Sequence, residues 1–175
     1  LVYASSKQDI DSLYNKINII GRLINKGTKK KYSQNTTPAS ATNRSSIDQT
    51  NYPIIAIGSS TGGPAALAAV LSSIPTNLHA ATVLIQHDDM AFAPGMAQWL
   101  NEQTGFPVRI AKSGDIPKPG QALLAATNDH LILNKHGKLV YTSDPEELVF
   151  RPSVDIFYES INKYWKSDIT AILLT

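Results

Sequence analysis

The first fifty residues divide into an amphipathic segment and a polar segment. Between residues 7 and 26, large apolar residues recur at steps of three and four, as they do on one face of a helix. Residues 28–50 are rich in Ser, Thr and Asn and have almost no large apolar residue, so they cannot bury enough surface to order themselves. We predict a helical unit at 1–27, the tail of an upstream domain or a dimerising helix, and a linker at 28–51.

From Tyr52 onward, short apolar runs bounded by turns alternate with segments of helical periodicity. This alternation is typical of a mostly parallel, doubly wound α/β sheet with helices on both faces, a Rossmann-like three-layer fold. We predict one such domain over 52–175, with a β-hairpin over 130–142 at one edge of its sheet. The predicted strands are 53–57, 82–86, 121–126, 131–133, 138–142 and 169–174, and the predicted helices are 63–73, 94–103 and 153–165.

Composition narrows the possible chemistry. Of the 175 residues, 42% are hydrophobic and 17% are charged, which is ordinary for a chain that buries a core. There is no cysteine, which excludes disulfides, thiolate metal sites and cysteine nucleophiles. The four histidines and fourteen acids show no tight metal-ligand spacing, and no apolar run approaches the roughly 18 residues of a membrane span. We therefore expect no metal, no cofactor and no membrane insertion, and we see no signal peptide.

The net charge of +2 conceals an asymmetry along the chain. Residues 1–50 carry eight Lys or Arg and three Asp, a balance of +5, so the remainder carries −3. A basic half can indicate nucleic acid or an acidic partner. Here the basic cluster is only Lys29 to Lys31, with Tyr32 as its one adjacent aromatic, so we favour a solvated linker and expect no nucleic-acid partner.

The stretch IIAIGSSTGGP, residues 54–64, raises the question of what its turn holds. A dinucleotide fingerprint needs a glycine where Ser60 stands, because the backbone must approach the pyrophosphate there, and the Lys-Ser/Thr ending of a P-loop is absent. The pattern G-x-S-x-G from Gly58 to Gly62 fits better, with a strand before it and a helix after it. It would expose the Ser60 hydroxyl beside helix-start N–H groups that can stabilise an oxyanion. The alternative is a turn that only caps the helix.

A candidate base follows one βαβ unit later. His87 ends the predicted strand 82–86, 27 residues after Ser60. If the two strands are neighbours, both residues emerge at the carboxyl edge of the sheet, and the imidazole can take the proton from the serine. The alternative is a polar histidine that merely ends a strand. Of the other histidines, His79 and His136 are expected in a loop and a turn, and His130 is expected to be structural.

A serine hydrolase also needs a carboxylate that orients its imidazole. Several acids are available, but none is assigned to this role by the sequence pattern alone. The carboxylates considered are Asp88, Asp89, Asp115, Asp129 and Asp155.

Several short motifs, in this order, carry a resemblance to a known family. They are Ala56 to Pro64, Gln86-His87, Gly114-Asp115, Pro119-Gly120, His130-Leu131 and Arg151 to Asp155. Over residues 53–175 the chain resembles the protein-glutamate methylesterases of bacterial chemotaxis, the CheB-type response regulators. The family has a receiver domain, a linker and an α/β methylesterase domain that hydrolyses glutamyl methyl esters and can deamidate glutamines on chemoreceptors.

The resemblance implies roles for individual residues. Ser60 matches the nucleophile of the family's Ser-His-Asp triad, His87 matches its histidine, and Thr61, Gly62 and Gly63 match the start of the helix beneath the site. It also implies a cytoplasmic protein without a cofactor. The partners it implies are methyl-accepting chemoreceptors and, in the full-length protein, an upstream receiver domain with its histidine kinase.

The chain departs from the family pattern in several places, among them residues 126–129, where the family has an Ala-Pro-Gly-rich turn. After the histidine the family usually has Met-Pro-Pro-x-Phe, whereas residues 88–92 read DDMAF. The family's triad aspartate follows the strand that matches 169–174, beyond Thr175, so we expect little activity from the chain as given. The competing hypothesis is a non-catalytic signalling or docking module of a chemosensory pathway.

Overall fold

The computed structural model describes residues 52–87, 89–148 and 150–174. The helix predicted over 7–26 and the linker predicted over 28–51 lie outside the described residues.

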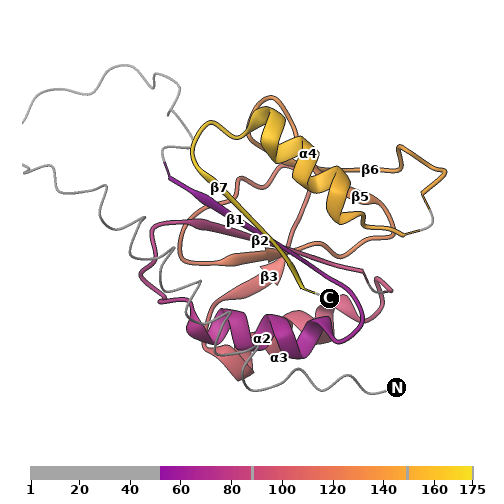
Figure 1. Ribbon diagram of the computed structural model, residues 1–175. Coiled ribbons are helices and arrows are strands. Elements are labelled where there is room, and N and C mark those ends of the chain that lie inside the picture. The colour runs from indigo at the N-terminus through magenta and orange to yellow at the C-terminus, as the bar shows by residue number, and fades with distance from the viewer. Residues whose placement is uncertain (1–51, 88, 149, 175) are drawn as a thin grey trace, which may run out of the picture.

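A five-stranded parallel sheet forms the centre of the described fold (Figure 1). Its spatial order is β3-β4-β2-β1-β7, and each neighbouring pair is parallel. This architecture confirms the predicted α/β class. The five strands are β1 (Ile54–Ser59), β2 (Ala81–Gln86), β3 (Val108–Ile110), β4 (Ala122–Leu124) and β7 (Ile169–Leu174).

Helices cover both faces of the sheet. In Figure 1, α2 (Gly63–Ser73) and α3 (Ala93–Thr104) lie below it, and α4 (Val154–Tyr164) lies above it. Local sequence explains their ends: α2 and α3 carry a proline in the first turn, and the Ser153 side chain caps α4 by accepting a hydrogen bond from the Ile156 N–H. In the described ranges, no helix is long and apolar enough to cross a membrane.

The period of two along each strand builds a core on each face of the sheet. Ile55 and Ile57 of β1 point into the cluster beneath α2 and α3, whereas Ile54 and Ala56 point into the cluster beneath α4. Both faces of β1 and β2 are therefore buried, which explains why these strands read as continuous apolar runs. The carboxyl ends of β1 and β2 are thus held by packing on both sides.

The predicted hairpin forms from β5 (His130–Leu133) and β6 (Leu139–Thr142), but not at an edge of the main sheet. It is a separate two-stranded antiparallel sheet that packs beside α4 (Figure 1). The reason is its apolar side chains, since Leu131, Leu133 and Leu139 join the core cluster beneath α4. The expectation of an edge hairpin was therefore right in its pairing and wrong in its place.

Strand β3, absent from the predicted elements, closes one edge of the sheet. Its three residues are too few for a period-two pattern, and side chains hold it in place. The Asn101 amide accepts from the Val108 N–H at 2.7 Å and donates to the Val108 carbonyl at 2.5 Å, as a neighbouring strand would.

One half-buried tyrosine ties β1 to β7 from above the sheet. The Tyr158 hydroxyl on α4 accepts a hydrogen bond from the Gly58 N–H at 2.9 Å and donates to the Ile172 carbonyl at 2.5 Å. Burial raises the pKa of this hydroxyl, so it stays protonated and able to donate. Tyr158 therefore holds β1 two residues before Ser60.

We expect Tyr158→Phe to lower the free energy of unfolding by about 1–3 kcal/mol, because it leaves the buried Gly58 N–H without its partner. Tyr164→Phe on the same helix is the matched control, since that hydroxyl makes no hydrogen bond to any of the residues that the structure describes. Urea unfolding of the two variants measures the difference. Equal stability of the two variants would contradict the bridge.

Asp115 links the loop after β3 to the hairpin. Its carboxylate accepts from Arg109 Nη1 at 2.6 Å and from the Lys112 N–H at 2.8 Å, and its carbonyl accepts from the Leu139 N–H. The hydrogen bond from Arg109 holds the pKa of the Asp115 carboxyl below its usual value. Because the folded pKa is the lower one, this stabilisation is complete above the unfolded pKa and is lost as pH falls through the folded value.

Asp115→Asn should therefore destabilise the domain at neutral pH by about 1 kcal/mol or less, given the partial exposure of the pair. The difference from the unmodified protein should shrink below pH ~4. Asp168→Asn, which changes an exposed carboxylate at the start of β7, is the control. Urea midpoints measured from pH 2.5 to 7 test this, and a difference independent of pH would contradict the assigned ion pair.

Candidate functional site

Two adjacent serines end β1, and only the second faces solvent. The Ser59 side chain is buried and donates to Gln86 Oε1 at 2.5 Å, so its hydroxyl is already hydrogen-bonded and is inaccessible to a substrate. Ser60 is exposed, directly after β1 and three residues before α2 begins. The strand-turn-helix context predicted for G-x-S-x-G is therefore present, and Ser60 is the hydroxyl that a substrate can reach.

The turn after Ser60 aims backbone N–H groups toward solvent. Gly62 caps α2 with a positive φ of 81°, a conformation that favours glycine, and no side chain caps this helix. The N–H groups of Thr61 and Gly62 donate to no group in the part of the chain that the structure describes. An oxyanion beside Ser60 can therefore meet two free donors at the positive end of a helix.

Gly63, the third residue matched to the start of the helix, has no free N–H for an oxyanion. Its N–H donates to the Ser60 carbonyl at 2.7 Å and is therefore already engaged in the turn. What this position requires is the absence of a side chain, because a Cβ on Gly63 would lie 2.0 Å from Gln86 Oε1. The expected set of backbone donors is thus reduced to Thr61 and Gly62.

His87 lies beside this turn because β1 and β2 are parallel neighbours. Their register pairs Ser59 with Gln86, and the His87 N–H donates to the Ser59 carbonyl at 3.0 Å. Ser60 and His87 therefore leave the sheet side by side, at its carboxyl edge. No hydrogen bond joins the Ser60 hydroxyl to the His87 ring in this structure, and such contacts are often loose until substrate binds.

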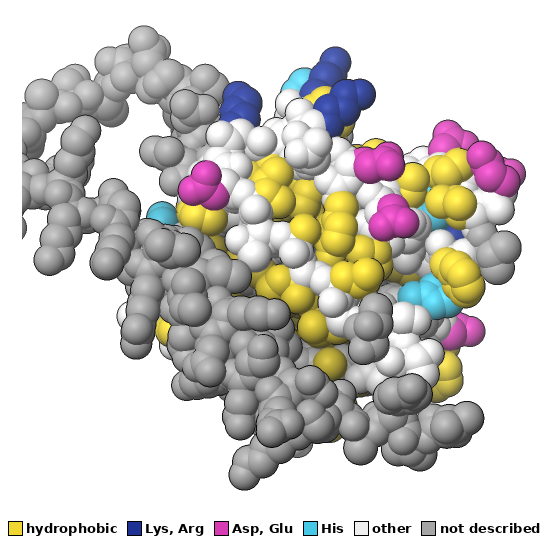
Figure 2. Space-filling view, viewed as in Figure 1, with side chains coloured by type: hydrophobic (Ala, Val, Ile, Leu, Met, Phe, Trp, Pro, Cys, Tyr) yellow, Lys and Arg dark blue, Asp and Glu magenta, His cyan; other side chains and the backbone are white. Residues whose placement is uncertain are grey.

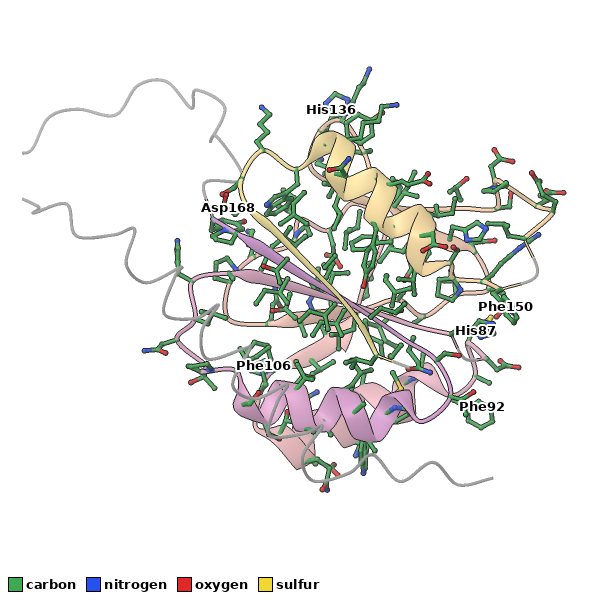
Figure 3. The ribbon with its side chains drawn as sticks, viewed as in Figure 1. His87, Phe92, Phe106, His136, Phe150 and Asp168 are labelled. Atoms are coloured by element: carbon green, nitrogen blue, oxygen red, sulfur yellow. The ribbon has the colours of Figure 1, made fainter. Side chains whose placement is uncertain are left out.

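An aromatic side chain packs on the half-buried imidazole. The Phe150 ring meets the His87 ring edge-on, with 4.7 Å between centroids. Figure 3 shows His87, Phe150 and Phe92 together at one end of the sheet, far from Asp168 at the start of β7. The site therefore brings together loops that follow β2 and precede α3 and α4.

The surface around His87 is shallow, apolar and acidic. Met90, Phe92 and Phe150 expose 51%, 64% and 66% of their surface, which is unusual for side chains of this kind. Figure 2 shows a histidine flanked by hydrophobic and acidic side chains at this end of the molecule. A small open hollow lies beside it, lined by Gln86, Asp89, Met90, Ala93, Met96, Ala125, Ala126, Thr127 and Pro152.

His130 has a structural role, as expected. It is fully buried; its Nδ1 accepts from the Ser153 N–H at 3.1 Å, and its Nε2 lies 3.3 Å from the Pro145 carbonyl. The ring therefore carries its proton on Nε2 and joins the hairpin to the start of α4.

Three of the carboxylates considered as the triad acid lie in local environments set by groups other than the His87 ring. Asp115 pairs with Arg109, Asp155 lies in the first turn of α4, and Asp89 accepts from the Ala91 N–H at 2.9 Å. Asp88 lies outside the described residues. No group of three His, Asp or Glu side chains that could hold a metal ion occurs in the described ranges.

Gln86 was not among the site residues expected from the sequence. Its buried amide contacts the backbone of both Ser60 and His87. A polar residue that ends an apolar strand is a recognisable signal, because a buried amide has to find hydrogen-bond partners.

Known proteins are similar to this chain in sequence. The protein-glutamate methylesterase/protein-glutamine glutaminase 3 of Pseudomonas aeruginosa is 51% identical over 122 residues, which are 70% of this chain and 36% of that protein. The corresponding enzyme 4 of Burkholderia thailandensis is 53% identical over 123 residues, again 70% of this chain and 36% of that protein. The chain thus spans about a third of the length of these relatives.

A solved structure and a family model agree with these relatives. The CheB methylesterase catalytic domain of Thermotoga maritima superposes with a TM-score of 0.64 at 32% identity, covering 70% of this chain and 66% of that one. The model of the CheB methylesterase family matches residues 55–175. With the fold and these matches in agreement, the chain belongs to the CheB methylesterase family.

Proposed function

We propose that the full-length protein is a protein-glutamate methylesterase that hydrolyses glutamyl methyl esters on methyl-accepting chemoreceptors. The observation that carries this proposal is the exposed Ser60 beside His87 at the carboxyl ends of two paired parallel strands. Membership of the family and relatives named protein-glutamate methylesterase/protein-glutamine glutaminase support the same reaction, with deamidation of glutamine as a second activity.

The proposed reaction uses only groups at this edge of the sheet. Ser60 Oγ attacks the ester carbonyl while His87 takes its proton. The N–H groups of Thr61 and Gly62 hold the oxyanion that forms. His87 then returns the proton to the departing methoxy group, which leaves as methanol. Water, deprotonated by His87, cleaves the acyl-enzyme to a glutamate carboxylate and restores the Ser60 hydroxyl.

An aspartate that follows β7 completes the proposed triad. β7 pairs with β1 on the side opposite β2, with Leu174 opposite Ser59. Residues that follow β7 therefore leave the sheet at the same edge as Ser60 and His87. This register supports the acid position that the family resemblance implies.

An open site suits a side chain carried on a protein. The hollow beside His87 is shallow, and the exposed apolar side chains around it can contact the surface from which the ester projects. We infer that the partners are chemoreceptors, with a receiver domain upstream and its histidine kinase. The family resemblance that suggests these partners also implies a cytoplasmic reaction.

Methanol release from methylated receptors by the full-length protein tests the proposal. Ser60→Ala should reduce kcat by at least about 10³-fold, because it removes the nucleophile. The matched control is Ser73→Ala at the far end of α2, which should leave the rate unchanged. Methanol release by Ser60→Ala at the rate of the unmodified protein would overturn the nucleophile assignment. Receptor binding without methanol release by the unmodified protein would instead indicate a docking module.

The role of His87 has a separate test. His87→Gln should also reduce kcat by at least about 10³-fold, since it removes the base. His136→Gln in the hairpin turn, an exposed position, should not change the rate. The same methanol assay compares the two variants, and equal rates would show that the imidazole beside Ser60 is not the base.

A further inference from the structure

Gln86 ends β2, and every polar atom of its side chain is engaged. The residue is 5% exposed. Its Oε1 accepts from the Ser59 hydroxyl at 2.5 Å, and its Nε2 donates to the Ser60 carbonyl at 3.1 Å and to the His87 carbonyl at 3.2 Å. One side chain therefore contacts the backbone of both proposed reacting residues.

The number of N–H hydrogens on the Gln86 amide decides whether this side chain can also bind a substrate. A primary amide has two N–H hydrogens, and both are donated to backbone carbonyls here. The Ser59 hydroxyl donates to Oε1 and so fixes which end of the amide faces those carbonyls. Although Gln86 borders the hollow, it has no donor left for a substrate. Its contribution has to pass through Ser60 and His87.

The carbonyls of Ser60 and His87 lie beyond the last backbone hydrogen bond that joins these two segments, which the His87 N–H donates to the Ser59 carbonyl. The paired register of β1 and β2 ends at Ser59 and Gln86, one residue before the reacting pair. Beyond that point, the amide of Gln86 is a rigid crosslink between the two chain segments. Backbone position sets where each side chain begins, so the crosslink fixes the separation between hydroxyl and imidazole.

The fold leaves space for this crosslink at Gly63. A Cβ there would lie 2.0 Å from Gln86 Oε1, 2.8 Å from its Cδ and 2.9 Å from Ser59 Oγ. A Cβ atom essentially never makes non-bonded contacts this short, so any side chain on Gly63 would displace the amide. The Gln86 amide can therefore occupy its position only because residue 63 has no side chain.

We propose that Gln86 is a positioning residue that holds Ser60 and His87 at reacting distance through their backbone carbonyls. The proposal rests on the methylesterase function proposed above. It assigns to Gln86 a contribution to kcat, and not to the binding of the receptor.

Steady-state methanol release by the full-length protein, with kcat and KM determined separately, tests the role. Gln86→Leu keeps the approximate volume and removes all three hydrogen bonds, so kcat should fall between about tenfold and a hundredfold. KM should change less than about threefold, because no substrate contact is lost. Gln103→Leu, at an exposed position on α3, is the control and should behave as the unmodified protein.

Gln86→Glu provides a second test if the leucine variant fails to fold. A carboxylate keeps the acceptor for Ser59 but lacks both donors, so kcat should again fall at neutral pH. Protonation returns one donor, and the ratio of variant to unmodified kcat should therefore rise as pH falls. A merely structural role would not produce this pH-dependent recovery. Ser59→Ala, which keeps both donors, should lose less than about fivefold.

The outcomes separate the two proposals. Unaltered kcat in Gln86→Leu and Gln86→Glu, with Ser60→Ala inactive, would overturn the positioning role and leave the esterase intact. A raised KM with unaltered kcat would also overturn it, because that pattern indicates a binding role. An active Ser60→Ala would remove the function on which the inference rests, and the inference with it.

Discussion

The parallel pairing of β1 with β2 determines where the proposed reacting residues lie. Parallel strands end at the same edge of a sheet, so a fixed register places whatever follows β1 beside whatever follows β2. Here the register pairs Ser59 with Gln86, and the next residues are Ser60 and His87. A register shift of one residue would turn the buried faces of both strands toward the wrong core and separate the pair.

Packing on both faces makes that register rigid. The strands are buried completely, with one core beneath α2 and α3 and the other beneath α4 and the hairpin. Tyr158 adds a polar tie, since its hydroxyl joins β1 to β7 just before the site. Because the backbone around the site is held rigidly, the reacting groups need to move little when the reaction occurs. The exposed loops that carry Phe92 and Phe150 lie outside this rigid frame and form the surface around the site (Figure 3).

Much of the fold follows from local patterns. The apolar segments 53–57 and 82–86 predicted strands that form as Ile54–Ser59 and Ala81–Gln86, and helix α2 was predicted with its observed ends. Strand β3 could not be predicted because its pairing partner on the edge is the Asn101 side chain, which a pattern of apolar residues does not reveal. The hairpin's place depended on tertiary packing, since an apolar hairpin fits either an edge or a face.

The site was only partly visible in the sequence. Ser60 and His87 were proposed from their motif and spacing, and the pairing of β1 with β2 brings them to the same edge of the sheet. Gln86 and the role of Gly63 were missed because both depend on one close approach, that of the glutamine amide to the helix start. Two glycines that look alike in the sequence thus serve different needs, Gly62 for its positive φ and Gly63 for space.

Covalent labelling of the full-length protein by a fluorophosphonate, mapped by peptide mass spectrometry, tests the central claim most directly. The two adjacent serines differ sharply in this test. The Ser59 hydroxyl is buried and hydrogen-bonded to Gln86, whereas Ser60 is exposed beside the His87 imidazole. We predict a single adduct on Ser60, with labelling that slows in His87→Gln and not in His136→Gln. Labelling of a different serine, or none at Ser60 in a protein that still releases methanol, would contradict it.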